Sequence, residues 1–175
     1  DAHVHKFLHL SVNELATRDN TMYVEDPDVN AIARTTGFVS SNLVGGGLSR
    51  KMNSLQTYLF PVGSAIGTMR YRPVDVKMED AAIRIMKIRM VNYNPAYDNL
   101  TDLAPDVASI NSKFYHQLTP SDNQDTYDLT FHYNESQDGT YQHIAQYESQ
   151  ITPEYWQKTG AITLGTSTQT PNTKF

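Results

Sequence analysis

Three oxygen-bearing side chains in the first third of the chain have the spacing of calcium ligands. Asp26, Asp28 and Asn30 lie two residues apart, like the first ligands of an EF-hand loop. Ala31 stands where that loop needs a glycine for its sharp turn, and Gly37 stands where it needs a bidentate glutamate. These residues exclude an EF-hand but leave an irregular Ca²⁺ site open, beside their ordinary role in turns. A second set of the same kind consists of Asp122, Asn123 and Asp125.

Three histidines near the start of the chain could supply metal ligands of another kind. His3, His5 and His9 share one parity in a predicted strand, so their imidazoles could emerge on one face. Neutral imidazole suits zinc, but no third ligand class is spaced nearby. The alternative is a strand that exposes its histidines to solvent, and apart from the open Ca²⁺ site we predict no cofactor.

Aromatic side chains late in the chain suggest binding and not catalysis. Tyr155 and Trp156 are candidates for a platform on which the flat face of a sugar stacks. The alternative role of these rings, and of the 11 tyrosines in general, is packing in a core or across neighbouring strands. Both roles stay open at this point.

The composition argues against several classes of function. Nineteen acidic residues against fourteen Lys and Arg give a net charge of -5, and no basic run is available to neutralise nucleic-acid phosphates. The chain has no cysteine, which excludes a thiol nucleophile and cysteine-ligated metals. No serine lies in a nucleophile-elbow pattern, and the glycines at 45–47 lack the Gly-Lys-Ser/Thr ending of a phosphate-binding loop. We therefore predict a protein that is not an enzyme, binds no nucleic acid and does not insert directly into a membrane.

Short runs of alternating apolar and polar residues must position all of these side chains. The clearest run places Tyr127, Leu129 and Phe131 on one face of a strand. Pro61 and Pro73 lack a donor N–H, which places them at strand ends, edges or bulges. Many such runs, separated by turn residues and without long helices, predict an all-β fold. The specific prediction is an antiparallel β-sandwich, Ig-like or jelly-roll-like, with at most one or two short helical turns.

Residues 1–165 are predicted to form this single domain, and residues 166–175 a polar tail or linker. The segment Met78–Tyr93 contains good helix formers as well as alternation, so strand and helix both stay open. We favour a strand with a β-bulge near Met86-Lys87, which would bring its isoleucines into register. Asp138-Gly139 predicts a hairpin turn.

Five short motifs follow one another in a fixed order between residues 20 and 165. They are Gly37-Phe38-Val39, Gly47-Leu48-Ser49-Arg50-Lys51, Tyr58-Leu59-Phe60-Pro61-Val62-Gly63, Tyr71-Arg72-Pro73-Val74 and Tyr127-Asp128-Leu129-Thr130-Phe131. The order resembles a β-sandwich module of large secreted Bacteroidetes cell-surface proteins. These proteins are type IX secretion cargo and include gliding-type adhesins. Phe60-Pro61-Val62-Gly63 after a basic pair is the most specific element of the resemblance.

The resemblance implies a non-enzymatic, extracellular structural or adhesive module of a larger cell-surface protein or filament. Because the chain begins at Asp1, we expect it to be a piece of a longer protein. The implied partners are neighbouring modules or subunits of the same assembly. A lectin-like, carbohydrate-binding module that recognises surface glycans is the alternative function.

Overall fold

The computed structural model describes residues 1–121, 127–148, 152–159, 162–164 and 168–171. Strands make up nearly all of the regular structure in these residues. The exceptions are the 3-10 turn η1 (Pro95–Asp98) and the single helical turn α1 (Glu135–Asp138). The predicted all-β fold, with at most one or two short helical turns, is confirmed. In the described part of the chain, neither helical turn is long and apolar enough to cross a membrane.

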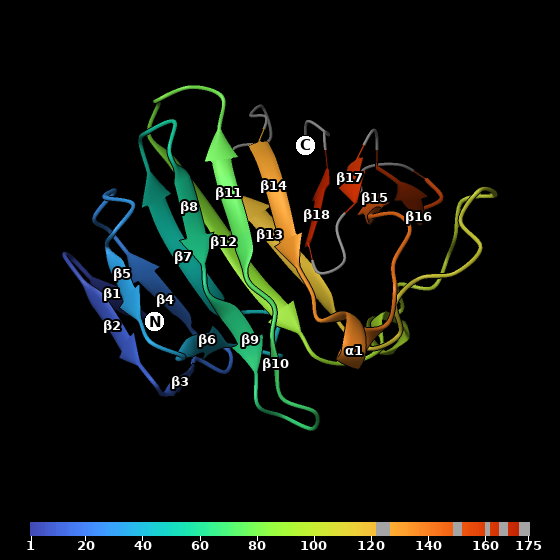
Figure 1. Ribbon diagram of the computed structural model, residues 1–175, viewed down its shortest axis with the longest axis horizontal. Helices are drawn as coiled ribbons and strands as arrows, with labels where there is room; N and C mark the ends of the chain where they lie inside the picture. The colour runs from blue at the N-terminus through green and yellow to red at the C-terminus, as the bar shows by residue number, and fades with distance from the viewer. Residues whose placement is uncertain (122–126, 149–151, 160–161, 165–167, 172–175) are drawn as a thin grey trace.

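Residues 2–64 form a region of stacked strands that we call the parallel coil (Figure 1). It has three successive circuits of three strands each: β1 (Ala2–Val4), β2 (Leu8–Ser11) and β3 (Glu14–Ala16); β4 (Thr21–Val24), β5 (Ile32–Arg34) and β6 (Phe38–Ser40); β7 (Gly47–Met52), β8 (Thr57–Phe60) and β9 (Val62–Ser64). Parallel pairs join β1 to β4 and β4 to β7, β2 to β5, and β3 to β6 and β6 to β9. Antiparallel pairing was predicted throughout, and it is wrong for β1 to β6 and for the edges of β7 and β9 that pair with β4 and β6.

Apolar side chains stack in columns inside the parallel coil. Leu15 lies opposite Val39, and Val39 lies opposite Val62 in the next circuit. Val4 and Val24 form a second such column. Val24, Val39 and Val62 are each 1% exposed. Branched side chains pack well on a pleated surface, so the alternation that predicted strands also fills the interior of the coil.

Two corners of the parallel coil require glycine because backbone packs directly on backbone. A Cβ atom at Gly46 would lie 2.0 Å from the carbonyl oxygen of Arg18. A Cβ atom at Gly37 would lie 2.4 Å from the carbonyl oxygen of Leu10. In both cases the neighbour belongs to the preceding circuit, so only a residue without a side chain fits.

The parallel coil ends at β8, which does not pair with β5 and so does not continue the β2–β5 sheet. Strand β8 instead pairs antiparallel with β11 (Val74–Met78), which belongs to the second region of the molecule. Arg50 stands at this point, in the column of Val24, and is 1% exposed. Its guanidinium donates hydrogen bonds to the carbonyl oxygens of Leu59 at 2.6 Å, Asp28 at 3.1 Å and Val29 at 3.2 Å. Burial lowers the pKa of Arg50 to about 10. It stays charged at neutral pH and provides donors where the parallel ladder stops.

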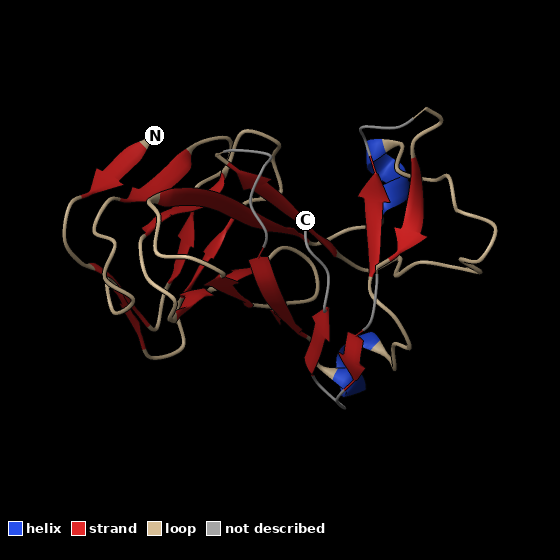
Figure 2. Cartoon of the chain, turned by 90° about the horizontal axis from the view of Figure 1, so that it is seen from above, coloured by secondary structure: helices blue, strands red, loops and turns tan. Residues whose placement is uncertain are grey.

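Antiparallel strands build the rest of the molecule. They are β10 (Arg70–Tyr71), β11, β12 (Arg84–Val91), β13 (Tyr115–Pro120), β14 (Tyr127–His132), β17 (Ile162–Leu164) and β18 (Thr168–Pro171). They extend the coil into two five-stranded sheets, β1-β4-β7-β12-β13 (sheet A) and β17-β18-β14-β11-β8 (sheet D), and into the four-stranded sheet β10-β9-β6-β3. The last two strands, β15 (Ala145–Glu148) and β16 (Tyr155–Lys158), pair with each other. In Figure 1, β15 to β18 lie on the side of the molecule away from the N-terminus, and Figure 2 shows strands at that end in the view from above.

One apolar core unites the two regions. It runs from Leu8 in the coil to Tyr133 after β14, and it includes inward side chains of both five-stranded sheets. Leu48 and Ile88 enter it from sheet A, and Phe60 and Val76 enter it from sheet D; each is 0% exposed. Burying such a side chain contributes roughly 1.5–3 kcal/mol. The shared core positions the two sheets relative to each other.

The open alternative at Met78–Tyr93 is settled as strand β12. Its register with β7 is continuous from Arg84 to Ile88, without the predicted bulge. Met86, Ile88 and Met90 face the core, whereas Ile85 is 39% exposed. The predicted bulge is wrong because the sequence argument put all of these apolar residues on one face.

Two predictions for the C-terminal part are also corrected. Asp138-Gly139 is not a hairpin turn, since Asp138 ends α1 and is buried. Thr168–Pro171, expected in a polar tail, is strand β18 and pairs with β14. Residues 166–167 and 172–175 of the predicted tail lie outside the described residues.

Candidate functional site

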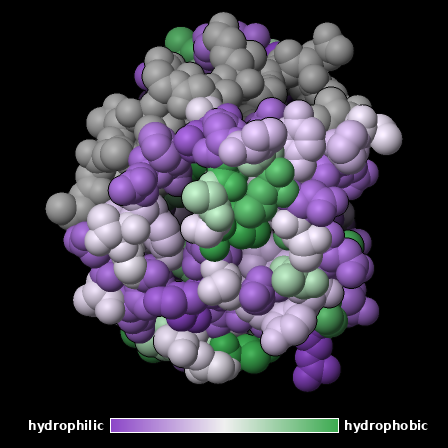
Figure 3. Space-filling view, turned by 90° about the vertical axis from the view of Figure 1, so that its right-hand side faces the viewer, coloured by the Kyte–Doolittle hydropathy of each residue, from purple (hydrophilic) through white to green (hydrophobic). Residues whose placement is uncertain are grey.

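A hollow of about 1630 Å³ opens at the C-terminal end of the molecule. It is lined by residues of β13, β14, β16 and the segments 106–111 and 140–147. Figure 3 looks at this side and shows an apolar patch bordering a hollow in a largely polar surface. The elements around it come from distant parts of the sequence, so the hollow exists only in the folded chain.

Strand β13 runs along the hollow as the last strand of sheet A. One of its edges pairs with β12, from Tyr115 opposite Val91 to Pro120 opposite Met86. Among the described residues, no strand pairs with its other edge. Its residues 115–120 all line the hollow. The hollow therefore combines side chains with an unpaired backbone edge.

The inner wall of the hollow is apolar and aromatic. Leu118 from β13 and Leu129 and Phe131 from β14 line it. The ring of His116 lies 5.3 Å from that of Phe131 and 5.8 Å from that of Phe114. This wall can bind apolar groups by excluding water.

His116 is held in its neutral form inside this wall. Its Nε2 donates a 2.7 Å hydrogen bond to the carbonyl oxygen of Arg72. Burial lowers the pKa of His116 to about 4, and the charges of Arg72 and His132 act in the same direction, against the hydrogen bond. At neutral pH the ring is an uncharged donor with a fixed orientation.

A buried ion-pair cluster beside the hollow anchors α1. The Asp138 carboxylate is 0% exposed and accepts hydrogen bonds from Nε of Arg70 at 3.1 Å and from Nε of Arg72. It also accepts the backbone N–H of Asn134 at 2.9 Å. Burial raises the pKa of Asp138, but the hydrogen bonds from Arg72, Asn134 and Arg70 outweigh it and the net pKa is lowered. The carboxylate is ionised and satisfied, which is typical of a structural anchor.

Two further contacts fix the segment after α1 as a wall of the hollow. The ammonium of Lys113 donates to the carbonyl oxygens of Gln137 at 2.8 Å and Asp138 at 3.0 Å. The Tyr141 hydroxyl donates to the Asp138 carbonyl at 3.1 Å, and its ring lies 4.9 Å from that of Tyr133. Burial and the Asp138 charge raise the pKa of Tyr141 to about 12. The phenol stays a neutral donor.

The outer wall of the hollow is more polar. The Asp98 carboxylate accepts hydrogen bonds from the hydroxyls of Tyr93 at 3.0 Å and of Tyr115. Burial and the bond to Asp98 raise the pKa of both tyrosines. Arg89 donates to Gln117 Oε1 at 2.6 Å. The outer face of β13 thus meets charged and hydroxyl groups, while its inner face meets hydrocarbon.

The two aromatic residues predicted as a sugar platform lie in β16 at this end of the molecule. Trp156 is only 8% exposed and packs with Val91 and Tyr115 in a second, smaller core. Its indole N–H donates to the carbonyl oxygen of Leu100 at 3.0 Å. Tyr155 is half-buried in β16. Trp156 is therefore a packing residue, and the pair does not present two open ring faces.

The structure uses the predicted calcium ligands to form turns. Oδ1 of Asp26 accepts the backbone N–H of Asp28 at 3.0 Å, and Oδ1 of Asp28 accepts that of Asn30 at 2.7 Å. The carbonyl oxygens of Asp28 and Val29 already bind the Arg50 guanidinium. The positive charge of Arg50 therefore lies directly beside the turn that the candidate ligands form. The other candidates, Asp122, Asn123 and Asp125, lie outside the described residues.

The three predicted histidines lie on different elements and do not converge. His3 is in β1, stacks on Tyr23 with ring centres 4.5 Å apart, and contacts Glu25 at 2.7 Å. His5 lies in the connection to β2, and His9 in β2. In the parts of the chain that the structure describes, no three His, Asp or Glu side chains are grouped to hold a metal ion.

Sequence reasoning missed the hollow and its anchor. Arg70 and Arg72 were visible as two cations two residues apart, but their partner Asp138 is 66 residues beyond Arg72.

Comparison of the chain with protein-family models, with curated proteins and with solved structures finds no match.

Proposed function

We propose that this chain is a non-enzymatic docking module, a structural or adhesive unit of a larger extracellular cell-surface protein or filament. The observation that carries the proposal is the free edge of β13 beside an apolar hollow. Unpaired strand edges recruit other polypeptide segments through backbone hydrogen bonds. The surrounding titratable groups His116, Asp138 and Tyr141 are fixed in single protonation states by structural contacts. That arrangement suits binding better than proton transfer.

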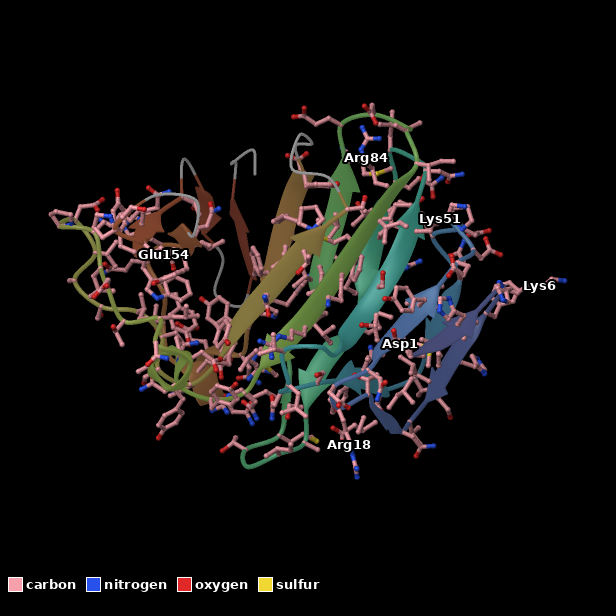
Figure 4. The ribbon with its side chains drawn as sticks, turned by 180° about the vertical axis from the view of Figure 1, so that it is seen from behind. Asp1, Lys6, Arg18, Lys51, Arg84 and Glu154 are labelled. Carbon is pink, nitrogen blue, oxygen red and sulfur yellow. The ribbon has the colours of Figure 1, made fainter. Side chains whose placement is uncertain are left out.

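The parallel coil adds a second set of strand edges at the other end. β1 and β3 are the terminal strands of their sheets, and β2 pairs only with β5 among the described residues. Figure 4 places Asp1 and Lys6 at this end, far from Glu154 near the hollow. A unit with unpaired edges at opposite ends fits between neighbouring modules of one assembly.

We further infer that the two five-stranded sheets pack as a β-sandwich extended by the coil. The extracellular location and the type IX secretion route rest on the motif resemblance.

Carbohydrate binding is the second candidate. Tyr133, Tyr141 and Tyr147 line the hollow and could stack on a sugar. The burial of Trp156 weakens this candidate, because a sugar site needs an accessible ring face.

Probing both a peptide array and a glycan array with the fluorescently labelled chain tests the proposal. We expect saturable binding to peptides and none to glycans. Leu118→Glu, which places a charge in the apolar wall, should abolish peptide binding. Leu55→Glu is the matched control, since Leu55 is 53% exposed in the β7–β8 connection and should leave binding intact. If the chain binds glycans but no peptides, and Leu118→Glu abolishes the glycan binding, carbohydrate binding is the function instead.

A further inference from the structure

The backbone of β13 offers a definite set of free hydrogen-bonding groups. Ser121 donates its N–H to the carbonyl oxygen of Ile85 at 2.8 Å, which marks Ser121 and Ile85 as a hydrogen-bonded pair of the ladder. In an antiparallel ladder the bonded pairs alternate, so Tyr115, Gln117 and Thr119 also bond to β12. The N–H groups of His116 and Leu118 then point to the free edge.

Pro120 supports this assignment from chemistry alone. Proline has no N–H, and within sheets it occupies edge positions whose N–H side faces away from the neighbouring strand. Pro120 has the same parity as His116 and Leu118. The free edge therefore offers the N–H groups of His116 and Leu118 and the carbonyl oxygens of all three residues.

The two walls of the hollow define which side chains an added strand would carry. Inward positions of such a strand would meet Leu118, Leu129 and Phe131. Outward positions would meet the polar outer wall, which includes Asp98 and Arg89. Successive side chains of a strand alternate between its faces, so the matching segment alternates apolar and polar residues.

The dimensions of the hollow also fit an extended segment. Its volume of about 1630 Å³ exceeds the roughly 300–1,000 Å³ typical of small-molecule sites. The six residues of β13 provide an edge of about 20 Å at the usual strand rise.

Building on the docking function proposed above, we propose that the hollow accepts an extended peptide segment of a partner protein as an additional strand of sheet A. The segment pairs with the free edge of β13 and places apolar side chains at alternate positions against the inner wall. Backbone bonds to His116 and Leu118 supply the pairing, and the apolar wall selects the alternating pattern.

The test uses two peptide pools of identical composition. One pool alternates Val, Ile, Leu or Phe with Thr, Ser or Gln; the other arranges the same residues in apolar and polar blocks. Fluorescence anisotropy measures binding, and amide hydrogen exchange monitored by NMR reports on the backbone of β13. We expect the alternating pool to bind at least about tenfold more tightly, with new protection at the amides of His116 and Leu118.

Two variants test the backbone bonds directly. Leu118→Pro removes an outward N–H and should weaken binding about tenfold, whereas Pro120→Ala adds one and should tighten it about threefold. Unchanged chemical shifts of core amides in both variants show that the fold is kept. If Leu118→Pro disturbs the fold, the gain in Pro120→Ala decides the question alone.

Four results would overturn the proposal that a partner's peptide adds a strand. Peptide binding that leaves His116 and Leu118 unprotected, or equal binding of both pools, would reject it and leave the docking function standing. A dimer that protects these amides without peptide would show that the occupant is a second copy of this chain. Glycan binding without peptide binding would reject the docking function itself.

Discussion

Residues 2–64 and residues 70–132 both consist of short alternating strands, but they pair in opposite ways. In the parallel coil, Ala2 lies opposite Met22 and Thr21 lies opposite Gly47, so each circuit repeats the direction of the previous one. In the second region, β11 runs antiparallel to both β8 and β14. The two regions nevertheless share one core.

The two regions depend on different kinds of residue for their packing. Stacked circuits bring corner onto corner, so Gly37 and Gly46 contact the backbone of the preceding circuit. Outside the coil, a Cβ atom at Gly67 would meet nothing within 4 Å. The antiparallel region is instead held at its end by charged side chains, with Asp138 between two arginines. Arg50 lies at the boundary between the two regions, where the parallel pairing of β4 with β7 ends, and its guanidinium donates hydrogen bonds to backbone carbonyl oxygens there.

The largest effect is expected at this boundary. Arg50→Met leaves three carbonyl groups without their charged donor and should lower the free energy of unfolding by about 3–5 kcal/mol. Lys51→Met, on the outer face of the same strand, should change it by under about 0.5 kcal/mol. Urea unfolding followed by circular dichroism measures both. Equal losses in the two variants would show that the boundary has no special role.

The anchor of the antiparallel region should come next. Asp138→Asn leaves two buried guanidinium groups without a carboxylate and should cost about 3 kcal/mol. Asp75→Asn removes the partly exposed partner of His132 and should cost under about 1 kcal/mol. Because its folded-state pKa is lowered, Asp138 stabilises the fold above its unfolded pKa, and this contribution is lost as the pH falls through the folded value. Urea unfolding at neutral and acid pH checks the sign: the difference in the free energy of unfolding between the unmodified chain and Asp138→Asn should shrink as the pH falls, and a difference that stays constant would contradict it.

A smaller effect distinguishes the corners of the two regions. Gly46→Ala places a methyl group against the carbonyl oxygen of Arg18 and should cost about 2 kcal/mol. Gly67→Asn should cost under about 1 kcal/mol, because Asn tolerates the positive φ of 68° and the site is open. Thermal unfolding midpoints compare the two. A similar small shift in both would contradict direct packing of one circuit on the next.

The smallest expected effect is the pH dependence due to His116. Its pKa is lowered from 6.5 to about 4, so below pH 6.5 the unfolded chain binds a proton that the folded chain does not. Stability should therefore fall as the pH decreases from 6.5 to about 4, by about 1–2 kcal/mol for this half-buried ring. His116→Gln should flatten this slope, and His9→Gln, an exposed histidine of the coil, should keep it. Urea titrations across this pH range measure the slope.

Local patterns predicted the strands well where one face of the strand is buried and the other is not. The expected alternation of Tyr127, Leu129 and Phe131 is found in β14. Pro61 falls between β8 and β9, and Pro73 between β10 and β11, at strand ends as expected. The prediction failed in β12, because Ile85 is exposed and no bulge is needed. An apolar residue identifies a strand more reliably than it identifies the buried face.

The candidate site was beyond prediction for a different reason. Its free edge belongs to β13. An edge is free when no other strand in the described part of the chain pairs with it, so it can be recognised only when the positions of all these strands are known. The sequence left Trp156 open between a sugar-stacking ring and a packing residue, and its neighbours Val91 and Tyr115, which come from other parts of the chain, bury it. No local pattern records such neighbours.

By itself the sequence determined that this chain is built of short strands with one apolar side, because the two-residue period is a property of each segment alone. Only the tertiary structure decided that the first circuits stack in parallel and that β13 keeps an open edge beside a hollow. Backbone ladder bonds are the same whatever side chains the strands carry, so the choice of partner and direction is made by the packing of the whole core.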